Sequence, residues 1–238
     1  MDFQPLTETV TLPSGVEATI REMTGQDEDL LMNEKLVKAG KAQHQLLGNL
    51  IQELDGKKPS SQDVMQMWSA DRAGVMLHAR VLSFGPELES THTCDNDDCK
   101  ADIQIRLDHI IEDLVFRTPP EDPASFDVTL PSGRVATLRA MRGSDEARLI
   151  AARQKGELMT ELIFTRLVDV EGMDDRNDIR RWLRAAPMRD RNALRKVMEK
   201  NEFGYQTQID ITCPVCNTEQ RVDVLSLRDF FFPGSHDQ

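Results

Sequence analysis

The sequence lacks any long apolar run, and this excludes one class of protein. None of its hydrophobic stretches approaches the roughly 20 apolar residues that a membrane-spanning helix needs. The opening, MDFQPLTETV, also lacks the basic and then apolar layout of a secretory signal. With 39% hydrophobic and 29% charged residues over 238 positions, the chain has the composition of a soluble globular protein. We expect a cytosolic origin and no membrane partner.

Acidic residues outnumber basic ones. The chain holds 29 Lys and Arg against 41 Asp and Glu, a formal net charge of −12. Backbone binding to nucleic acid needs clustered Lys and Arg, so we expect no nucleic acid as the main partner. The balance is uneven: residues 1–117 carry a net −10 and residues 118–238 a net −2. An Arg-rich stretch, 176–200, accounts for most of this difference, as a solvated helix surface or a docking face for a protein.

The common catalytic signatures are missing. The chain contains no G-x-S-x-G, no H-E-x-x-H and no Gly-rich phosphate loop. Carboxylate pairs such as Asp174 and Asp175 lie in polar turns, where nothing would raise a pKa for acid–base work. We therefore predict that the protein is not an enzyme.

Only four cysteines are present, and they form two pairs. Cys94 and Cys99 are separated by four residues, and Cys213 and Cys216 by two, each pair beside alternating apolar residues typical of a hairpin. Two thiolate pairs at hairpin tips are typical of one four-coordinate structural metal site. The sequence therefore predicts a zinc site with Cys94, Cys99, Cys213 and Cys216 as ligands.

Other interpretations of the cysteines stay open. An iron–sulfur cluster takes the same four ligands, and each pair could instead form a disulfide. The first pair could also be vestigial, since its loop, DNDD, is strongly acidic and resembles a solvated turn more than a calcium loop. His92 lies two residues before Cys94, but as a strand residue it is expected to face solvent rather than a metal.

The chain repeats itself. Residues 10–31 read VTLPSGVEATIREMTGQDEDLL and residues 128–149 read VTLPSGRVATLRAMRGSDEARL. Fourteen of the aligned positions carry the same residue in both stretches, which predicts an internal duplication. The offset is 118 residues at the hairpins and 119 at Cys94 and Cys213, so the cysteine pairs occupy equivalent places.

Each copy reads as a hairpin followed by helices. Thr24 with Asp27, and Ser144 in the second copy, are candidate helix caps. Apolar spacing then predicts a second helix over 46–54, with Gly56 as its stop, and a counterpart over 158–170. A short helix and a last helix follow, the last ones over about 71–84 and 190–203, before the cysteine hairpins.

The predicted architecture is α+β, with two copies of a β-hairpin–helices–zinc-knuckle hairpin related by a pseudo-two-fold. Copy A spans 1–117 and copy B spans 118–238, with a proline-rich extended linker beginning at Arg117. The helices and the joined knuckles would hold the copies face to face as one unit. Three consecutive phenylalanines, 230–232, predict a buried C-terminal anchor or an apolar plug for a partner subunit.

The closing pattern resembles the T4-type baseplate proteins of tailed bacteriophages. The resemblance rests on the CPVC hairpin and the following DFFFP from Gln208 onward, together with the LPSG hairpin. It implies a non-enzymatic structural or assembly component of a tail baseplate or hub, assembled in the host cytoplasm and located in the virion. Its partners would be other tail proteins, namely hub, tape-measure or wedge subunits.

A second hypothesis belongs to another class. Paired cysteine knuckles also occur in zinc ribbons, so the chain could be a cytosolic zinc-ribbon adaptor that binds a nucleic-acid-associated complex. The acidic balance counts against this alternative, and salt-sensitive binding to DNA or RNA would favour it.

Overall fold

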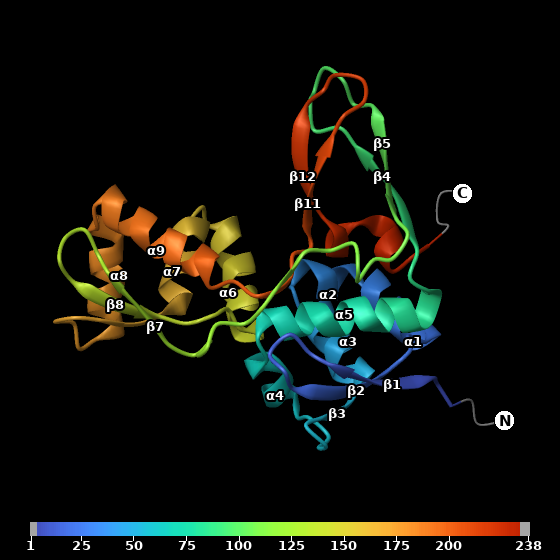
Figure 1. Cartoon of the computed structure of the whole chain (residues 1–238), viewed down its shortest axis with the longest axis horizontal. Helices are drawn as coiled ribbons and strands as arrows, with labels where there is room; N and C mark the ends of the chain where they lie inside the picture. Colours follow the sequence, from blue (N-terminus) through green and yellow to red (C-terminus); the bar gives the residue numbers. More distant parts are fainter. Residues whose placement is uncertain (1–3, 234–238) are drawn as a thin grey trace.

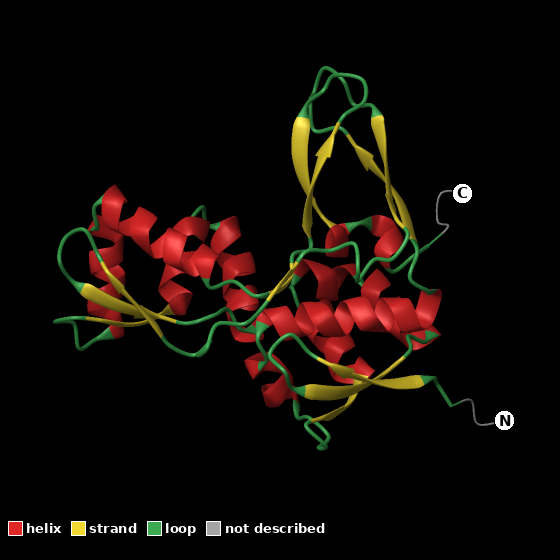
Figure 2. Cartoon of the chain, viewed as in Figure 1, coloured by secondary structure: helices red, strands yellow, loops and turns green. Residues whose placement is uncertain are grey.

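A computed structural model of the chain describes residues 4–233 and has a mixed α+β fold. Three parts are visible in Figures 1 and 2: a body, a helical lobe and a projecting arm. The body contains the described residues up to 84 together with the C-terminal residues 224–233. The helical lobe is formed by residues 126–200. The arm consists of two cysteine-bearing hairpins, within 88–107 and 208–223.

The body places a small sheet beneath helices. The antiparallel sheet has the order β1-β2-β3, and helix α5 runs across the body between this sheet and the arm (Figure 1). Apolar residues of β1, β2, α3 and α5 form the core beneath it. The elements are β1 (Thr7–Thr11), β2 (Glu17–Arg21), α1 (Gly25–Met32), α2 (Glu34–Lys38), α3 (Ala42–Leu50), β3 (Ile51–Leu54), α4 (Ser61–Gln66) and α5 (Ser69–Phe84).

The helical lobe has the same order of elements without a counterpart of α2. Its sheet has the order β7-β8-β9, and its own core lies between that sheet and the helices. The elements are β7 (Phe126–Thr129), β8 (Val135–Leu138), α6 (Gly143–Gln154), α7 (Leu158–Arg166), β9 (Leu167–Val170), α8 (Arg176–Ala185) and α9 (Met188–Lys200).

The predicted second helix of each half is wrong at its C-terminal end. Helix α3 stops at Leu50, and β3 pairs antiparallel with β2; likewise α7 stops at Arg166, and β9 pairs with β8. Each hairpin would otherwise leave one edge of backbone donors and acceptors unpaired, so the third strand satisfies them. Apolar residues at helical spacing do not predict this pairing, because it depends on a strand about 30 residues away in the sequence.

The last helices also differ from the predicted ranges. Helix α5 begins two residues earlier than expected, at Ser69, and α9 runs from Met188 to Lys200 and ends before Phe203. The following residues turn into strand β10 (Gly204–Tyr205), which pairs with β6 (Phe116–Arg117) at the start of the proline-rich linker. No helix lies within 117–124, as the prolines predict.

The C-terminal segment returns to the body. After the arm strands, two short 3₁₀ turns, η1 (Val224–Ser226) and η2 (Arg228–Phe230), pack on the first half. Val222, Val224 and Phe230 lie in the same apolar core as the residues of β1, α3 and α5. Phe230 is fully buried, as the anchor prediction requires, whereas Phe231 and Phe232 are half-buried.

Each half locks its first hairpin to its last helix. In the body, the Ser14 amide donates to Asp71 Oδ1 at 2.8 Å and its hydroxyl donates to Oδ2 at 2.7 Å. In the helical lobe, the Ser132 amide donates to Asp190 Oδ1 at 3.1 Å. Burial raises the pKa of Asp71, which the Ser14 hydrogen bonds lower again in part.

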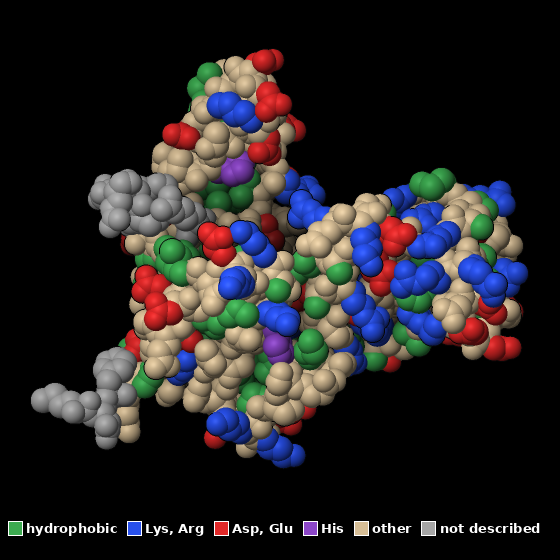
Figure 3. Space-filling view, turned by 180° about the vertical axis from the view of Figure 1, so that it is seen from behind, with side chains coloured by type: hydrophobic (Ala, Val, Ile, Leu, Met, Phe, Trp, Pro, Cys, Tyr) green, Lys and Arg blue, Asp and Glu red, His purple; other side chains and the backbone are tan. Residues whose placement is uncertain are grey.

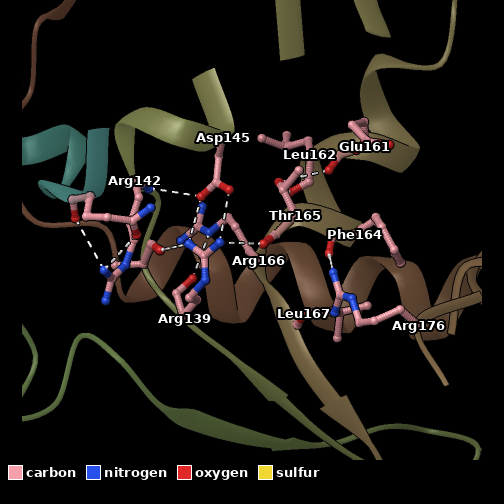
Figure 4. A network of polar contacts seen from close by, with 12 residues as sticks. Arg139, Arg142, Asp145, Glu161, Leu162, Phe164, Thr165, Arg166, Leu167 and Arg176 are labelled. Atoms are coloured by element: carbon pink, nitrogen blue, oxygen red, sulfur yellow. Dashed lines mark hydrogen bonds and ion pairs between the residues drawn. The ribbon is translucent and has the colours of Figure 1, made fainter. Parts of the chain in front are cut away.

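A buried ion pair closes the next turn of each half. Arg21 contacts Asp27 through both guanidinium nitrogens, at 2.6 and 3.0 Å, and Arg139 contacts Asp145 at 2.7 and 2.9 Å. Both carboxylates are buried at the first turn of a helix. Figure 4 shows the second pair with Arg166, whose guanidinium donates to the Arg139 carbonyl and lies 3.3 Å from Glu202. These shared contacts are what a duplication would leave, although the duplication and the pseudo-two-fold remain predictions.

The body and the helical lobe meet along α5 and α6. Arg72 is nearly fully buried and contacts Glu146 of α6 at 3.0 Å, and the Ser69 amide donates to the Met141 carbonyl. The Arg142 guanidinium lies over the Trp68 ring, 4.2 Å from its centre. A Cβ at Gly143 would come within 2.8 Å of the Arg72 side chain, so any larger residue there would force Arg72 to shift.

We predict that Asp27→Ala lowers the free energy of unfolding by about 3 kcal/mol, because it leaves Arg21 without its buried partner. Asp145→Ala is expected to cost a similar amount. Urea denaturation measures both. Asp29→Ala, on the exposed face of the same helix as Asp27, is the control and should change stability by less than about 0.5 kcal/mol.

The Asp27 carboxylate should also make the stability of the protein depend on pH. Burial would raise the pKa of Asp27, but hydrogen bonds from Arg21, Thr24 and Asn49 lower it below its ordinary value of 3.8. A lowered carboxyl pKa stabilises the fold above the unfolded-state value, and this contribution is lost as pH falls through the folded-state value. Asp27→Asn should therefore lose less stability than the wild type below about pH 4. An equal loss in both would contradict the ion-pair assignment.

Candidate metal centre

The arm brings two distant hairpins together. Strands β4 (Leu88–Thr93) and β5 (Asp102–Leu107) form the first hairpin, and β11 (Gln208–Thr212) and β12 (Glu219–Asp223) form the second. They rise side by side from the body, with their turns meeting at the tip (Figures 1 and 2). Inward-facing apolar side chains, including Ile103, Ile105 and Val222, separate the hairpins below the tip. Both cysteine pairs lie in the turns.

The first turn is closed by backbone hydrogen bonds. The Cys94 amide donates to the Ala101 carbonyl at 2.8 Å, and the Cys99 amide donates to the Asn96 carbonyl at 3.0 Å. Lys100, directly after the second cysteine, has a φ of 49°. This left-handed residue reverses the chain into β5.

The second turn is closed in the same way. The Cys213 amide donates to the Thr218 carbonyl at 3.0 Å, and the Asn217 amide donates to the Cys213 carbonyl at 2.9 Å. Asn217 follows Cys216 and has a φ of 57°, the conformation that asparagine tolerates best after glycine. The two turns therefore end alike although one has four residues between its cysteines and the other has two.

The four sulfur atoms converge. All four Sγ atoms lie within 4.8 Å of one another. Cys94 Sγ is 3.6 Å from Cys216 Sγ, and Cys99 Sγ is 3.8 Å from Cys213 Sγ, so close contacts join residues 122 and 114 positions apart. Cys94 and Cys213 are buried, and Cys99 and Cys216 are half-buried. The structure thus brings together all four cysteines that the sequence predicts as ligands.

These distances fit a shared cation. Four sulfurs at about 2.3 Å from a tetrahedral metal lie about 3.8 Å from one another. A disulfide would require about 2.0 Å between two sulfurs, and all four cysteines here are free. The cluster could therefore hold a metal ion, and an all-sulfur donor set suits zinc or iron.

Polar side chains align the two turns. The Asp95 amide donates to Gln220 Oε1 at 2.8 Å, and Asn96 Nδ2 donates to Thr218 Oγ1 at 3.4 Å. Sequence reasoning missed Gln220 and Thr218. A signal was present for Gln220, because it alternates with Val222 and so occupies the inward face of β12, where a polar side chain needs a partner.

The cysteines differ in their pKa values. The hydroxyl and the amide of Thr218 contact the Cys216 sulfur and lower its pKa to about 6. The Ala101 amide lowers the pKa of Cys99, but burial and the neighbouring Cys216 and Cys213 sulfurs together raise it to about 11. Four adjacent thiols cannot all lose their protons unless a cation offsets the repulsion between the thiolates. A bound metal would supply that charge.

The other candidates do not join the cluster. His92 is half-buried, and its Nε2 lies 3.7 Å from Asp95 Oδ1 rather than among the sulfurs. Asp95, Asp97 and Asp98 are exposed, as a solvated turn predicts. Among the described residues, the four cysteines form the only group of three or more His, Cys, Asp or Glu that could hold a metal ion.

Comparison with known proteins identifies the class of the molecule. The family model described as T4 bacteriophage base plate protein matches residues 5–122, about half of the chain. The chain belongs to this family of T4-type baseplate proteins. The match covers the first LPSG hairpin and the first cysteine pair, whereas the CPVC stretch that carried most of the resemblance in the sequence lies outside it.

No match was found among curated proteins or among solved structures. Within residues 4–233, none of the helices has the length and apolar character needed to span a membrane.

We predict that Cys94→Ser and Cys213→Ser have the same effect, because each would remove one of the four sulfurs that could hold a single metal ion. Each should lose bound metal and lower the free energy of unfolding by about 3–5 kcal/mol, the scale of releasing a cross-link across a loop of more than 100 residues. The double variant should be little worse than either single variant. Elemental analysis and urea denaturation measure this.

Val215→Ala is the matched control. Val215 lies between Cys213 and Cys216 and is 70% exposed, so its truncation should change neither metal content nor stability. Additive losses in the double variant would contradict a shared centre.

Proposed function

We propose that the protein is a non-enzymatic structural component of a phage tail baseplate or hub, stabilised by a structural zinc ion and acting through contacts with other tail proteins. The family assignment carries this proposal, since it implies a structural role in the baseplate and a location in the virion tail. Hub, tape-measure and wedge subunits are the partners that such a role would involve. Assembly would take place in the host cytoplasm.

The arm supports a structural rather than a catalytic use of the metal. The four cysteines would fill all four positions of a tetrahedral shell, so no position is left for a water or substrate. The chemistry supplied by zinc there is a redox-inert cross-link. The chain's own residues hold the turns: Gln220 accepts from the Asp95 amide, and Thr218 contacts Asn96 and the Cys216 sulfur.

We also propose that the molecule consists of two copies of one unit, 1–117 and 118–238, related by a pseudo-two-fold. The repeated sequence, the shared order of elements and the equivalent contacts of Asp71 with Ser14 and of Asp190 with Ser132 support the duplication. The two copies form one joint unit, because Val224 and Phe230 of the second copy lie in the core of the first.

Metal content tests the structural part of the proposal. We expect one zinc per chain in the purified protein, with all four cysteines titratable after denaturation without reductant. Chelation should destabilise the protein, because metal binding is coupled to folding. Iron in place of zinc would overturn the choice of metal, and absence of both metal and free thiols would show that the cysteines form disulfides.

Tail assembly tests the biological part. In cells carrying a phage genome from which this chain is deleted, we expect no complete tails by electron microscopy. Wild-type protein and Val215→Ala should restore tails, whereas Cys213→Ser should restore few or none because the arm loses its cross-link. Normal tails in the absence of the chain would refute a role in the baseplate, whatever the metal content.

A further inference from the structure

Helices α8 and α9 are the most basic part of an acidic molecule. Residues 176–200 contain nine Lys and Arg against three Asp and Glu, and the rest of the chain contains 20 against 38. Figure 3 shows blue side chains gathered over the helical lobe. A charge of this sign, confined to one lobe, requires a structural or a functional explanation.

Some of these basic residues stabilise the helical lobe itself. Arg180 and Arg184 on α8 form ion pairs with Glu161 and Glu157, at 2.8 and 2.7 Å, and so hold α8 against α7. The Arg176 and Arg180 guanidinium groups also stack on the Phe164 ring. These arginines contribute to the packing of the helical lobe, and we assign them no other role.

Three cations on α9 have no such explanation. Arg189, Lys196 and Lys200 are exposed, and within residues 4–233 none of them forms an ion pair. At 100° per residue their spacing places them within about 40° of one another, along about 16 Å of helix. We call these three residues the basic stripe.

The fold does not require the basic stripe. The corresponding helices of the first half, α4 and α5, contain only two basic residues, Arg72 and Arg80, and both are buried. The same helix pair therefore folds without any exposed Lys or Arg. The basic stripe therefore contributes positive charge to the surface and is not needed for the packing of the helices.

Exposed apolar side chains lie at the C-terminal end of the stripe. The Arg117 guanidinium donates to the Glu199 carbonyl at 3.3 Å, which places β6 beside the end of α9. Val115 and Phe116, just before Arg117, are 66% and 47% exposed. Aromatic residues and arginine are enriched at protein interfaces, and polar residues surround the apolar centre as a rim. Phe116 and Val115 would supply the apolar part of such an interface, and the basic stripe its rim. A polyanion such as DNA would also be repelled by the net charge of −12.

The same chain also carries an acidic surface, but this surface lies too far from the basic stripe to contact it within one molecule. Residues 1–117 carry a net −10, and Glu28 and Asp29 of α1 are exposed. Along the longest axis of the molecule, α1 lies at the end opposite to the helical lobe (Figure 1). The two surfaces therefore cannot meet within one molecule, whereas they can meet between two molecules.

We propose that the basic stripe of one copy docks on the acidic α1 surface of a second copy, in a head-to-tail contact. Such a contact joins two different surfaces, so it propagates into a ring or an open chain rather than closing as a dimer with two-fold symmetry. This inference goes beyond the proposed function and needs neither the metal nor a phage partner.

The test is self-association of the purified wild-type chain. Sedimentation velocity should show concentration-dependent oligomers that weaken as sodium chloride rises from about 0.05 to about 0.5 M. Reversing the stripe, with Arg189→Glu, Lys196→Glu and Lys200→Glu, should raise the dissociation constant at least about tenfold. The milder Arg189→Gln, Lys196→Gln, Lys200→Gln variant provides the same test if the reversed chain does not fold.

A control variant changes the net charge equally at another place. Lys35→Glu, Lys57→Glu and Lys58→Glu replace three exposed lysines of the acidic half, and this variant should associate at least as tightly as the wild type because the basic stripe is intact. Glu28→Lys with Asp29→Lys should abolish self-association, and mixing this variant with the stripe-reversed variant should restore it, because unlike charges then face each other at both contacts.

Three results would overturn the proposal: a monomeric wild type at low salt, association that is unchanged by reversal of the stripe, or mixed variants that stay monomeric. Stripe-dependent binding to DNA without self-association would instead assign the stripe to a nucleic acid. Normal tail assembly in the absence of the chain, together with normal self-association of the purified protein, would count against the baseplate role alone, so the two proposals fail separately.

Discussion

The burial of the C-terminal segment in the core of the first half is the constraint on which the rest of the structure depends. Val222, Val224 and Phe230 pack with residues of β1, α3 and α5, so the final strands must leave the helical lobe and cross back over the body. That crossing sets β11 and β12 beside β4 and β5. Burying apolar area is the dominant favourable contribution to folding, and here it also determines which hairpins become neighbours.

The four-sulfur cluster follows from that placement. Each cysteine turn is closed by its own backbone hydrogen bonds, but neither turn alone offers more than two sulfurs. Sulfur–sulfur contacts of 3.6 and 3.8 Å connect Cys94 with Cys216 and Cys99 with Cys213, across the two hairpins. A metal bound there would join the first half to the last segment directly, which explains how a narrow arm of two-stranded hairpins can stay in one piece.

The two halves are stabilised by the same local contacts but have different surfaces. Both lock the LPSG turn onto the last helix through a buried aspartate, and both close the next helix with an Arg–Asp pair. Their surfaces differ, however. Helices α4 and α5 are partly covered by the helical lobe and the C-terminal segment, whereas α8 and α9 lie at the end of the molecule, where Arg189 and Lys196 are exposed. The two halves therefore present different surfaces, although they share the same order of elements up to their last α-helix, apart from α2.

The hairpins, the capping of α1 by Thr24 and Asp27, and the four clustered cysteines could all be predicted from the sequence, because turn chemistry, capping and thiol pairing are local signals. The same local patterns could not show that the chain leaves the helix at Leu50 and Arg166, since β3 and β9 form only where a hairpin edge is available to pair with them. Nor could they place Phe230 in the first core or Gln220 beside Asp95. Those positions were decided by the tertiary structure, because they depend on contacts between residues more than 100 positions apart.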